Sequence, residues 1–220
     1  MPLPNLATQL SPRGRRTADQ PDGRSALLRE ATLAFSRQSF EAAGLRAIAS
    51  AAGVSPNLVA VHFKDKAGLW AACVTELTAQ MRLSLDVFEN LSGDESLPLA
   101  AKLHAMLDLT AQYYQQNPAT NGFILQALSG NPSRGEVLME SLLSPVFDAS
   151  RPLIEDGIAA GLVRARSPAI VVAIIHLTLG HADHFIQMMR VIDPDTPDDA
   201  CLTDLRQTLG TLLLIEPRND

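Results

Sequence analysis

Hydrophobic positions recur at helical spacing along most of the chain, and no window shows convincing strand alternation. Two short helical patterns meet at Gly53, and a longer one precedes them over residues 22–39. Six further helices are predicted, over residues 66–91, 97–116, 118–129, 133–160, 168–191 and 198–214. The expected fold class is therefore all-α, with about nine helices: an N-terminal three-helix helix-turn-helix domain and a C-terminal helical bundle. We expect Ser144–Pro145 to bend the helix over 133–160.

The segment 44–66 carries the most specific local pattern. Gly53 can take a left-handed backbone between the two short helices, and Val54 can fill the angle between them. Ser55 is a suitable N-cap for the second helix, and Pro56 fits its first position, where no N–H donor is needed. This pattern predicts a helix-turn-helix whose second helix is available for a DNA groove.

The second short helix divides into two faces. Val59 and Phe63 lie four residues apart and should pack on the first helix. An amide, an imidazole and two apolar groups face outward, where they suit base edges; they belong to Asn57, Leu58, Val61 and His62. Asp65 is expected to cap a long helix that begins at Lys66, and this lysine suits a phosphate.

Several residues of the four N-terminal helices together form a known pattern: Arg24, Ala31, Phe35, Ile48–Ala49, Ala52–Ser55, His62–Phe63, Lys66 and Leu69. With them, residues 24–72 resemble the DNA-binding domain of the TetR family of transcriptional regulators. Gly44, Ser39 and Ala60 depart from it, since they replace a capping threonine or serine, a glycine and a DNA-holding tyrosine. The candidate contacts to double-stranded DNA are Arg24, Arg46, Ser55, Asn57, Leu58, Val61, His62 and Lys66.

Charge is divided unevenly along the 220 residues, whose formal net charge is −6 at pH 7. Residues 1–66 contain 9 Lys and Arg against 5 Asp and Glu, giving +4. Residues 67–220 contain 9 against 19, giving −10. A small basic module joined to an acidic body is typical of a nucleic-acid-binding protein.

Three parts are predicted: a disordered arm (1–21), the helix-turn-helix DNA-binding domain (22–66) and a helical ligand-binding and dimerisation domain (67–220). The arm, which contains Arg13 to Arg16, either reaches DNA or is a solvated tail. No signal peptide is recognised and no apolar stretch is long enough for a bilayer. Cys73 and Cys201 lack metal or redox motifs, so reduced thiols and a cytoplasmic location are expected.

The last two predicted helices are richly apolar, at Ile170, Ile174 and Leu177 in one and at Leu202, Leu205, Leu209 and Leu212 in the other. An exposed pair of this kind needs a partner. The TetR resemblance implies a homodimer through residues 168–191 and 198–214, whose twofold symmetry fits a palindromic operator. The alternative is that both helices fold back onto their own core.

The resemblance also implies a small-molecule effector bound between helices of the body. The candidate ligand-binding residues are Met106, Thr110, Tyr113, Phe123, Phe147 and His176. For each of them, plain core packing is the alternative. The C-terminal half also faintly resembles the pyrimidine-utilisation regulators of the family, at residues 117–118, 126–132 and 180–185, but no ligand contact is carried over.

The sequence indicates no catalytic residues and no cofactor, so we do not expect an enzyme. His181, Asp183 and His184 have metal-ligand side chains, but on a helix Asp183 points away from the two histidines. We therefore predict no metal site there, and expect a polar patch in the dimer interface instead.

Together these patterns predict a ligand-responsive DNA-binding transcriptional regulator, a repressor that an effector releases from its operator. The alternative is an all-α carrier or scavenger of small molecules with a vestigial DNA-binding module. Gly44 and Ala60, which replace two usual backbone contacts, would support that alternative, whereas the +4 charge of residues 1–66 argues against it.

Overall fold

The computed structural model describes residues 23–215, in which every regular element is helical. The predicted arm, residues 1–21, lies outside the described residues. The α-helices are α1 (Gly23–Arg37), α2 (Leu45–Ala51), α3 (Asn57–Phe63), α4 (Lys66–Gly93), α5 (Leu99–Gln116), α6 (Pro118–Ser129), α7 (Pro132–Leu138), α8 (Ser144–Ala159), α9 (Pro168–Leu179), α10 (Ala182–Ile192) and α11 (Asp198–Leu213). A π-helical segment, η1 (Met139–Leu143), joins α7 to α8. The predicted all-α class is confirmed.

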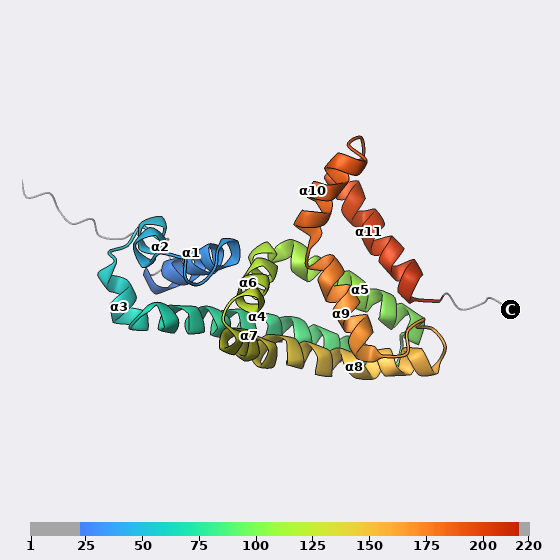
Figure 1. Cartoon of the computed structure of the whole chain (residues 1–220). Coiled ribbons are helices and arrows are strands. Elements are labelled where there is room, and N and C mark those ends of the chain that lie inside the picture. Colours follow the sequence, from blue (N-terminus) through green and yellow to red (C-terminus); the bar gives the residue numbers. More distant parts are fainter. Residues whose placement is uncertain (1–22, 216–220) are drawn as a thin grey trace, which may run out of the picture.

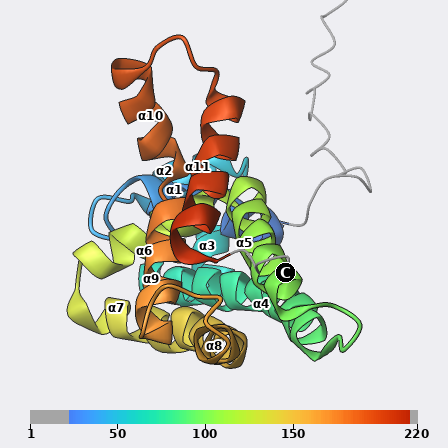
Figure 2. The same cartoon turned by 90° about the vertical axis from the view of Figure 1, so that its right-hand side faces the viewer.

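The helices form a small head and a larger body (Figure 1). Helices α1, α2 and α3 make the head at one end, and the long helix α4 runs from it along the body. Helices α5, α8 and α9 gather around the far part of α4, while α10 and the adjoining part of α11 project away from it, as both views show (Figure 2).

Two predicted helices are not regular throughout: one contains a π-helical segment and the other is split in two. The one over 133–160 consists of α7, η1 and α8, and the π-helical segment ends just before Ser144–Pro145, where a bend was expected. The one predicted over 168–191 is two helices, α9 and α10, bent by 62°. Gly180 lies at this break, where a Cβ would come within 2.8 Å of the Asn121 side chain. Among residues 23–215 no single helix is long and apolar enough to cross a bilayer, and only the bent α9–α10 pair reaches such a composition.

One hydrophobic core joins the head to the body. The ring of Phe123 in α6 lies edge-on to Phe35 of α1, with centroids 6.1 Å apart, and stacks on Trp70 of α4 at 5.6 Å. Gly122 permits this close approach, because a Cβ there would lie 2.6 Å from the Ser36 carbonyl oxygen. Helix α6 therefore packs directly on helix α1.

A second core lies among α5, α8, α9 and α11. It buries one stripe of each terminal helix, at Val171, Ile175 and Leu179 of α9 and at Leu209 and Leu213 of α11. Other apolar side chains of the same helices are exposed, namely Ile170, Ile174, Leu177 and Leu212. Each helix thus folds onto its own core along one face and leaves a second apolar face uncovered.

Candidate DNA-binding surface and effector cavity

The turn of the helix-turn-helix has the geometry that its sequence predicts. Gly53 has a φ of +66°, which glycine adopts without steric cost, and the Val54 N–H donates to the Ala49 carbonyl at 3.0 Å. The Ser55 hydroxyl accepts a hydrogen bond from the Asn57 N–H at 3.4 Å, but α3 begins at Asn57 with Pro56 at its N-cap, one residue later than predicted. Helix α3 is therefore held at a fixed angle to α2.

Helix α3 presents two faces, as predicted, with one difference. Val59 and Phe63 are buried, whereas Asn57, Val61 and His62 are exposed. Leu58 does not point fully outward. It is half-buried against the head core, because the packed face of this short helix is wide enough to include Leu58 beside Val59. The other exposed candidates on the head are Arg24, Arg46 and Ser55.

The junction between α3 and α4 is a tight turn that the sequence reading missed. Lys64 has φ 70° and ψ −56°, and the Asp65 N–H donates to the Phe63 carbonyl at 2.8 Å, which makes a γ-turn. The Asp65 carboxylate accepts from the Gly68 N–H at 2.8 Å, so the predicted cap is confirmed. Position 68 requires glycine in this arrangement, because a Cβ would lie 1.9 Å from the Phe63 carbonyl oxygen.

Lys66, a candidate phosphate contact, is engaged with the loop between α1 and α2. Its ammonium donates to the Glu41 carbonyl at 3.0 Å and lies 4.8 Å from the centroid of the Phe40 ring. The Arg134 guanidinium of α7 lies 3.8 Å from the same centroid and also pairs with the Glu41 carboxylate. This loop is therefore held by one cation from the start of α4 and one from α7.

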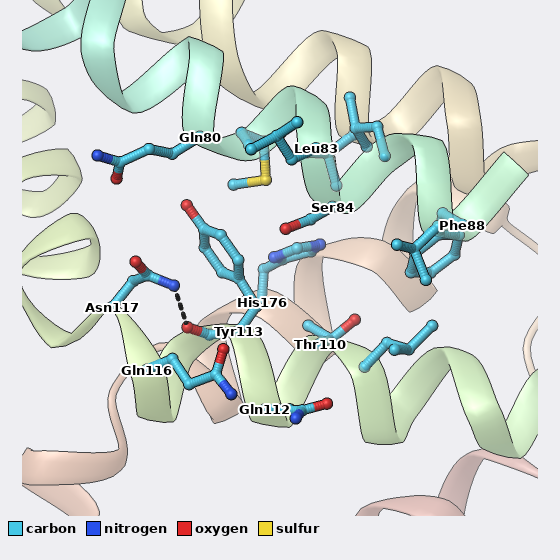
Figure 3. A pocket seen from close by; sticks show the side chains of 15 residues that line it. Gln80, Leu83, Ser84, Phe88, Thr110, Gln112, Tyr113, Gln116, Asn117 and His176 are labelled. Atoms are coloured by element: carbon cyan, nitrogen blue, oxygen red, sulfur yellow. Dashed lines mark hydrogen bonds between the residues drawn. The ribbon is translucent and has the colours of Figure 1, made fainter.

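A cavity of about 360 Å³ lies among α4, α5 and α9, at the lower end of the usual range for small-molecule sites. Figure 3 shows it from close by. Its apolar lining is Met81, Leu83, Leu85, Val87, Phe88, Leu109 and Val146. Its polar lining is Gln80, Ser84, Thr110, Gln112, Tyr113, Gln116, Asn117 and His176. None of these lining residues is Lys, Arg, Asp or Glu.

The structure brings together only part of the predicted ligand-binding set. Thr110, Tyr113 and His176 line the cavity, and Met106 lines a small adjoining space with Thr110 and His176. Phe123 does not reach the cavity, because it is packed in the head–body core. Phe147 does not line it either; its ring lies 6.0 Å from the Arg151 guanidinium.

Helix α4 supplies the cavity residues that the sequence reading missed. Gln80, Ser84 and Phe88 follow one another at intervals of four, so they share a face of this helix. Met81 and Leu85 are buried beside them. Two polar side chains on an otherwise apolar stripe were the signal that could have identified them.

The innermost polar groups of the cavity are neutral. The Tyr114 hydroxyl and His176 Nδ1 are 2.8 Å apart, and burial lowers the pKa of His176 from 6.5 to about 4. Burial also raises the pKa of Tyr113. A hydrogen-bonding contact from the Thr120 side chain opposes this rise, although the Tyr113 hydroxyl has no hydrogen bond of normal distance and angle.

The cavity shares walls with a groove beside the head. Gln80, Gln116 and Asn117 line both spaces. The groove runs along α1 and the start of α6, where Arg24 and Thr120 contribute to its wall. A molecule in the cavity would therefore contact residues that also border the first helix of the head.

The histidine cluster lies at the break between α9 and α10. His181 Nδ1 is 2.6 Å from the Leu177 carbonyl oxygen, and the rings of His181 and His184 are 6.0 Å apart. Asp183 is exposed. Within residues 23–215, no three His, Cys, Asp or Glu side chains gather as a metal ion would require.

The head and the body together define a helix-turn-helix protein whose helical bundle contains a cavity of a size suited to a small molecule. Residues 27–73 match the family described as bacterial regulatory proteins, tetR family. The chain is 30% identical over 183 residues to the HTH-type transcriptional regulatory protein RaaS of Mycobacterium tuberculosis, a match that covers 81% of this chain and 77% of that protein. The chain belongs to the TetR family and is a DNA-binding transcriptional regulator.

Solved structures share the fold at low sequence identity. The hemolysin II transcriptional regulator HlyIIR matches with a TM-score of 0.66 and 15% identity, over 88% of this chain and 98% of the other. FadR of Bacillus subtilis, solved in complex with stearoyl-CoA, matches with a TM-score of 0.60 and 13% identity, over 86% and 98%.

Proposed function

We propose that this regulator is a homodimeric repressor that a small molecule releases from a palindromic operator. The observation that carries the proposal is the cavity of about 360 Å³, three of whose lining residues also border the groove along helix α1. FadR, which shares the fold, was solved with stearoyl-CoA, and this supports a ligand-binding regulator. An occupied cavity would favour one arrangement of the two heads over another.

Two kinds of DNA contact are proposed for the head. Asn57, exposed at the start of α3, would read bases, with Val61 and His62 farther along the same face. Arg24, Arg46 and Lys66 would contact phosphates. The Lys66 ammonium would contact a phosphate either while it stays over the Phe40 ring or after it moves away from that ring. It can move because its hydrogen-bond partner, the Glu41 carbonyl, is uncharged. Leu58 is a weaker candidate, because it is half-buried.

The exposed apolar faces of α9 and α11 support the proposed dimer. Leu177 is 62% exposed and Leu212 is 64% exposed, and both lie on helices whose opposite stripes are already buried in the body core. A second copy of the chain would cover these faces in a symmetric interface. The twofold axis would then present two copies of α3 to successive major grooves.

A salt titration tests the DNA contacts. Sequences selected from a random pool would supply the operator, and a scrambled duplex would serve as the comparison. Lys66→Ala should weaken binding to both duplexes and lower the salt slope by about one unit, whereas Asn57→Ala should cost roughly 1–3 kcal/mol on the operator alone. Gln38→Ala, at an exposed position just beyond α1, is the control. The assignment is wrong if Asn57→Ala weakens both duplexes equally.

A second assay separates the repressor from the small-molecule carrier considered as the alternative. The carrier would bind ligands but select no sequence from the DNA pool, whereas the repressor would select a palindrome. Thr110→Phe fills the cavity next to His176, so it should abolish effector release while operator affinity stays. A Thr110→Phe variant that still responds normally to an identified effector would refute the cavity assignment.

A further inference from the structure

The innermost part of the cavity has hydrogen-bond groups whose direction can be assigned. His176 Nδ1 lies 2.8 Å from the Tyr114 hydroxyl, with the two rings at 79°. Tyr114 is buried, and its hydroxyl has no other hydrogen-bond partner within the described part of the chain. If Nδ1 carried the proton, the phenol hydrogen would have no acceptor, at the cost of a buried unsatisfied donor.

The Tyr114 hydroxyl therefore donates to Nδ1, and this fixes the tautomer of the histidine. A neutral His176 with an unprotonated Nδ1 carries its hydrogen on Nε2, at the opposite edge of the ring. Figure 3 shows the His176 ring inside the cavity, between Ser84 and Thr110. The ring thus offers an N–H donor there.

Tyr113 supplies a second donor. Its hydroxyl is buried and unsatisfied, and Figure 3 shows it directed across the cavity toward α4 and Gln80. By contrast, the Thr110 hydroxyl already donates to the Met106 carbonyl at 2.9 Å, so it keeps only acceptor capacity. Tyr113 and His176 therefore each offer a hydrogen-bond donor to the cavity.

The cavity holds no charge that could balance an ionic ligand. Its lining contains no Lys, Arg, Asp or Glu, and burial holds the pKa of His176 well below neutral pH. Beside the buried His176, a carboxylate or an ammonium group would lose its hydration without gaining an opposite charge, which is costly.

From this geometry we infer that the effector is an uncharged molecule with an apolar body and an oxygen acceptor, such as a carbonyl, which receives hydrogen bonds from Tyr113 and His176. This inference rests on the proposed function, because it concerns the ligand of the same regulatory cavity. It sets this site apart from one for a free fatty-acid anion, in which a cationic side chain would be needed beside the carboxylate.

Calorimetry on the full chain without DNA tests the ligand class. The probes are 2-octanone, octanoate and octylammonium at neutral pH, which share an apolar chain and differ in charge. We expect 2-octanone to bind about tenfold or more tightly than either ion, and Tyr113→Phe to weaken it roughly three- to tenfold. Thr78→Val is the matched control, because it removes a buried unsatisfied hydroxyl that does not line the cavity.

Nitrogen NMR of the ¹⁵N-histidine-labelled protein tests the tautomer directly, with His176→Gln to assign the signals. A protonated Nε2 and an unprotonated Nδ1 are expected, and Tyr114→Phe should change this pattern. The opposite tautomer, equal or tighter binding of octanoate, or no binding of 2-octanone would each overturn the inference. Sequence-selective operator binding, measured separately by anisotropy, would stay intact in all three cases unless the proposed function itself is wrong.

Discussion

Lowering the pH should destabilise the fold through His176. Burial lowers the pKa of this histidine from 6.5 to about 4, and the tyrosines beside it are neutral. Between these two pH values the unfolded chain binds a proton that the folded chain does not, so the free energy of unfolding falls as the pH falls. The loss begins near pH 6.5 and is complete below about pH 4.

The size of the effect follows from the two pKa values. At about 1.4 kcal/mol per pH unit, the interval from 6.5 to about 4 corresponds to about 3 kcal/mol in total. About 2 kcal/mol of this is lost between pH 7 and pH 5. That is a large share of the stability of an ordinary domain, which is roughly 5–15 kcal/mol.

Urea denaturation measures this loss of the free energy of unfolding. The wild type and His176→Gln are compared at about pH 7 and about pH 5, at one protein concentration. Glutamine does not titrate and can still accept from the Tyr114 hydroxyl. The wild type should lose about 2 kcal/mol more than the variant between the two pH values, while His184→Gln, at an exposed position of α10, should behave as the wild type. Parallel losses in wild type and His176→Gln would show that the histidine is not buried as a neutral group.

Three further results are expected. Gly68→Ala should destabilise the protein by roughly 1–3 kcal/mol and weaken operator binding, because its Cβ would meet the carbonyl that ends α3; Gly93→Ala, with open space around it, should not. Leu177→Asp should give a monomer by light scattering at micromolar concentration, whereas Val137→Asp on α7 should leave the dimer intact. After dialysis the wild type should contain less than stoichiometric zinc, with no change in His181→Ala, since only two histidines approach each other.

The head could be predicted from the sequence because its signals are local. Glycine at the turn, serine before α3 and aspartate before α4 each act on backbone groups within three residues of themselves. The prediction that Leu58 points outward was wrong. In a helix of only seven residues, the periodicity does not define how wide a face the neighbouring helices cover, and here that face includes Leu58.

The body was harder to predict because its geometry depends on contacts between distant residues. Residues 168–191 were predicted as one helix, but the chain bends at Gly180, where Asn121 of α6 approaches closely. Phe123 has an aromatic side chain of the kind that often contacts ligands. Its ring instead packs on Phe35 of the head and Trp70 of α4. The cavity itself is defined by what the packed helices leave unfilled, which no single helix encodes.

The free energy needed for regulation limits how the cavity can work. Shifting a two-state equilibrium from 1:99 to 99:1 requires about 5.5 kcal/mol of differential binding. Two neutral hydrogen bonds, from Tyr113 and His176, supply roughly 2 kcal/mol even if both exist in only one state. The remaining 3.5 kcal/mol or so corresponds to about 140 Å² of apolar surface that the ligand buries in that state alone. The cavity must therefore change shape between states. Because α6 begins at the cavity wall beside Asn117 and packs on α1 through Gly122, such a change would move the head.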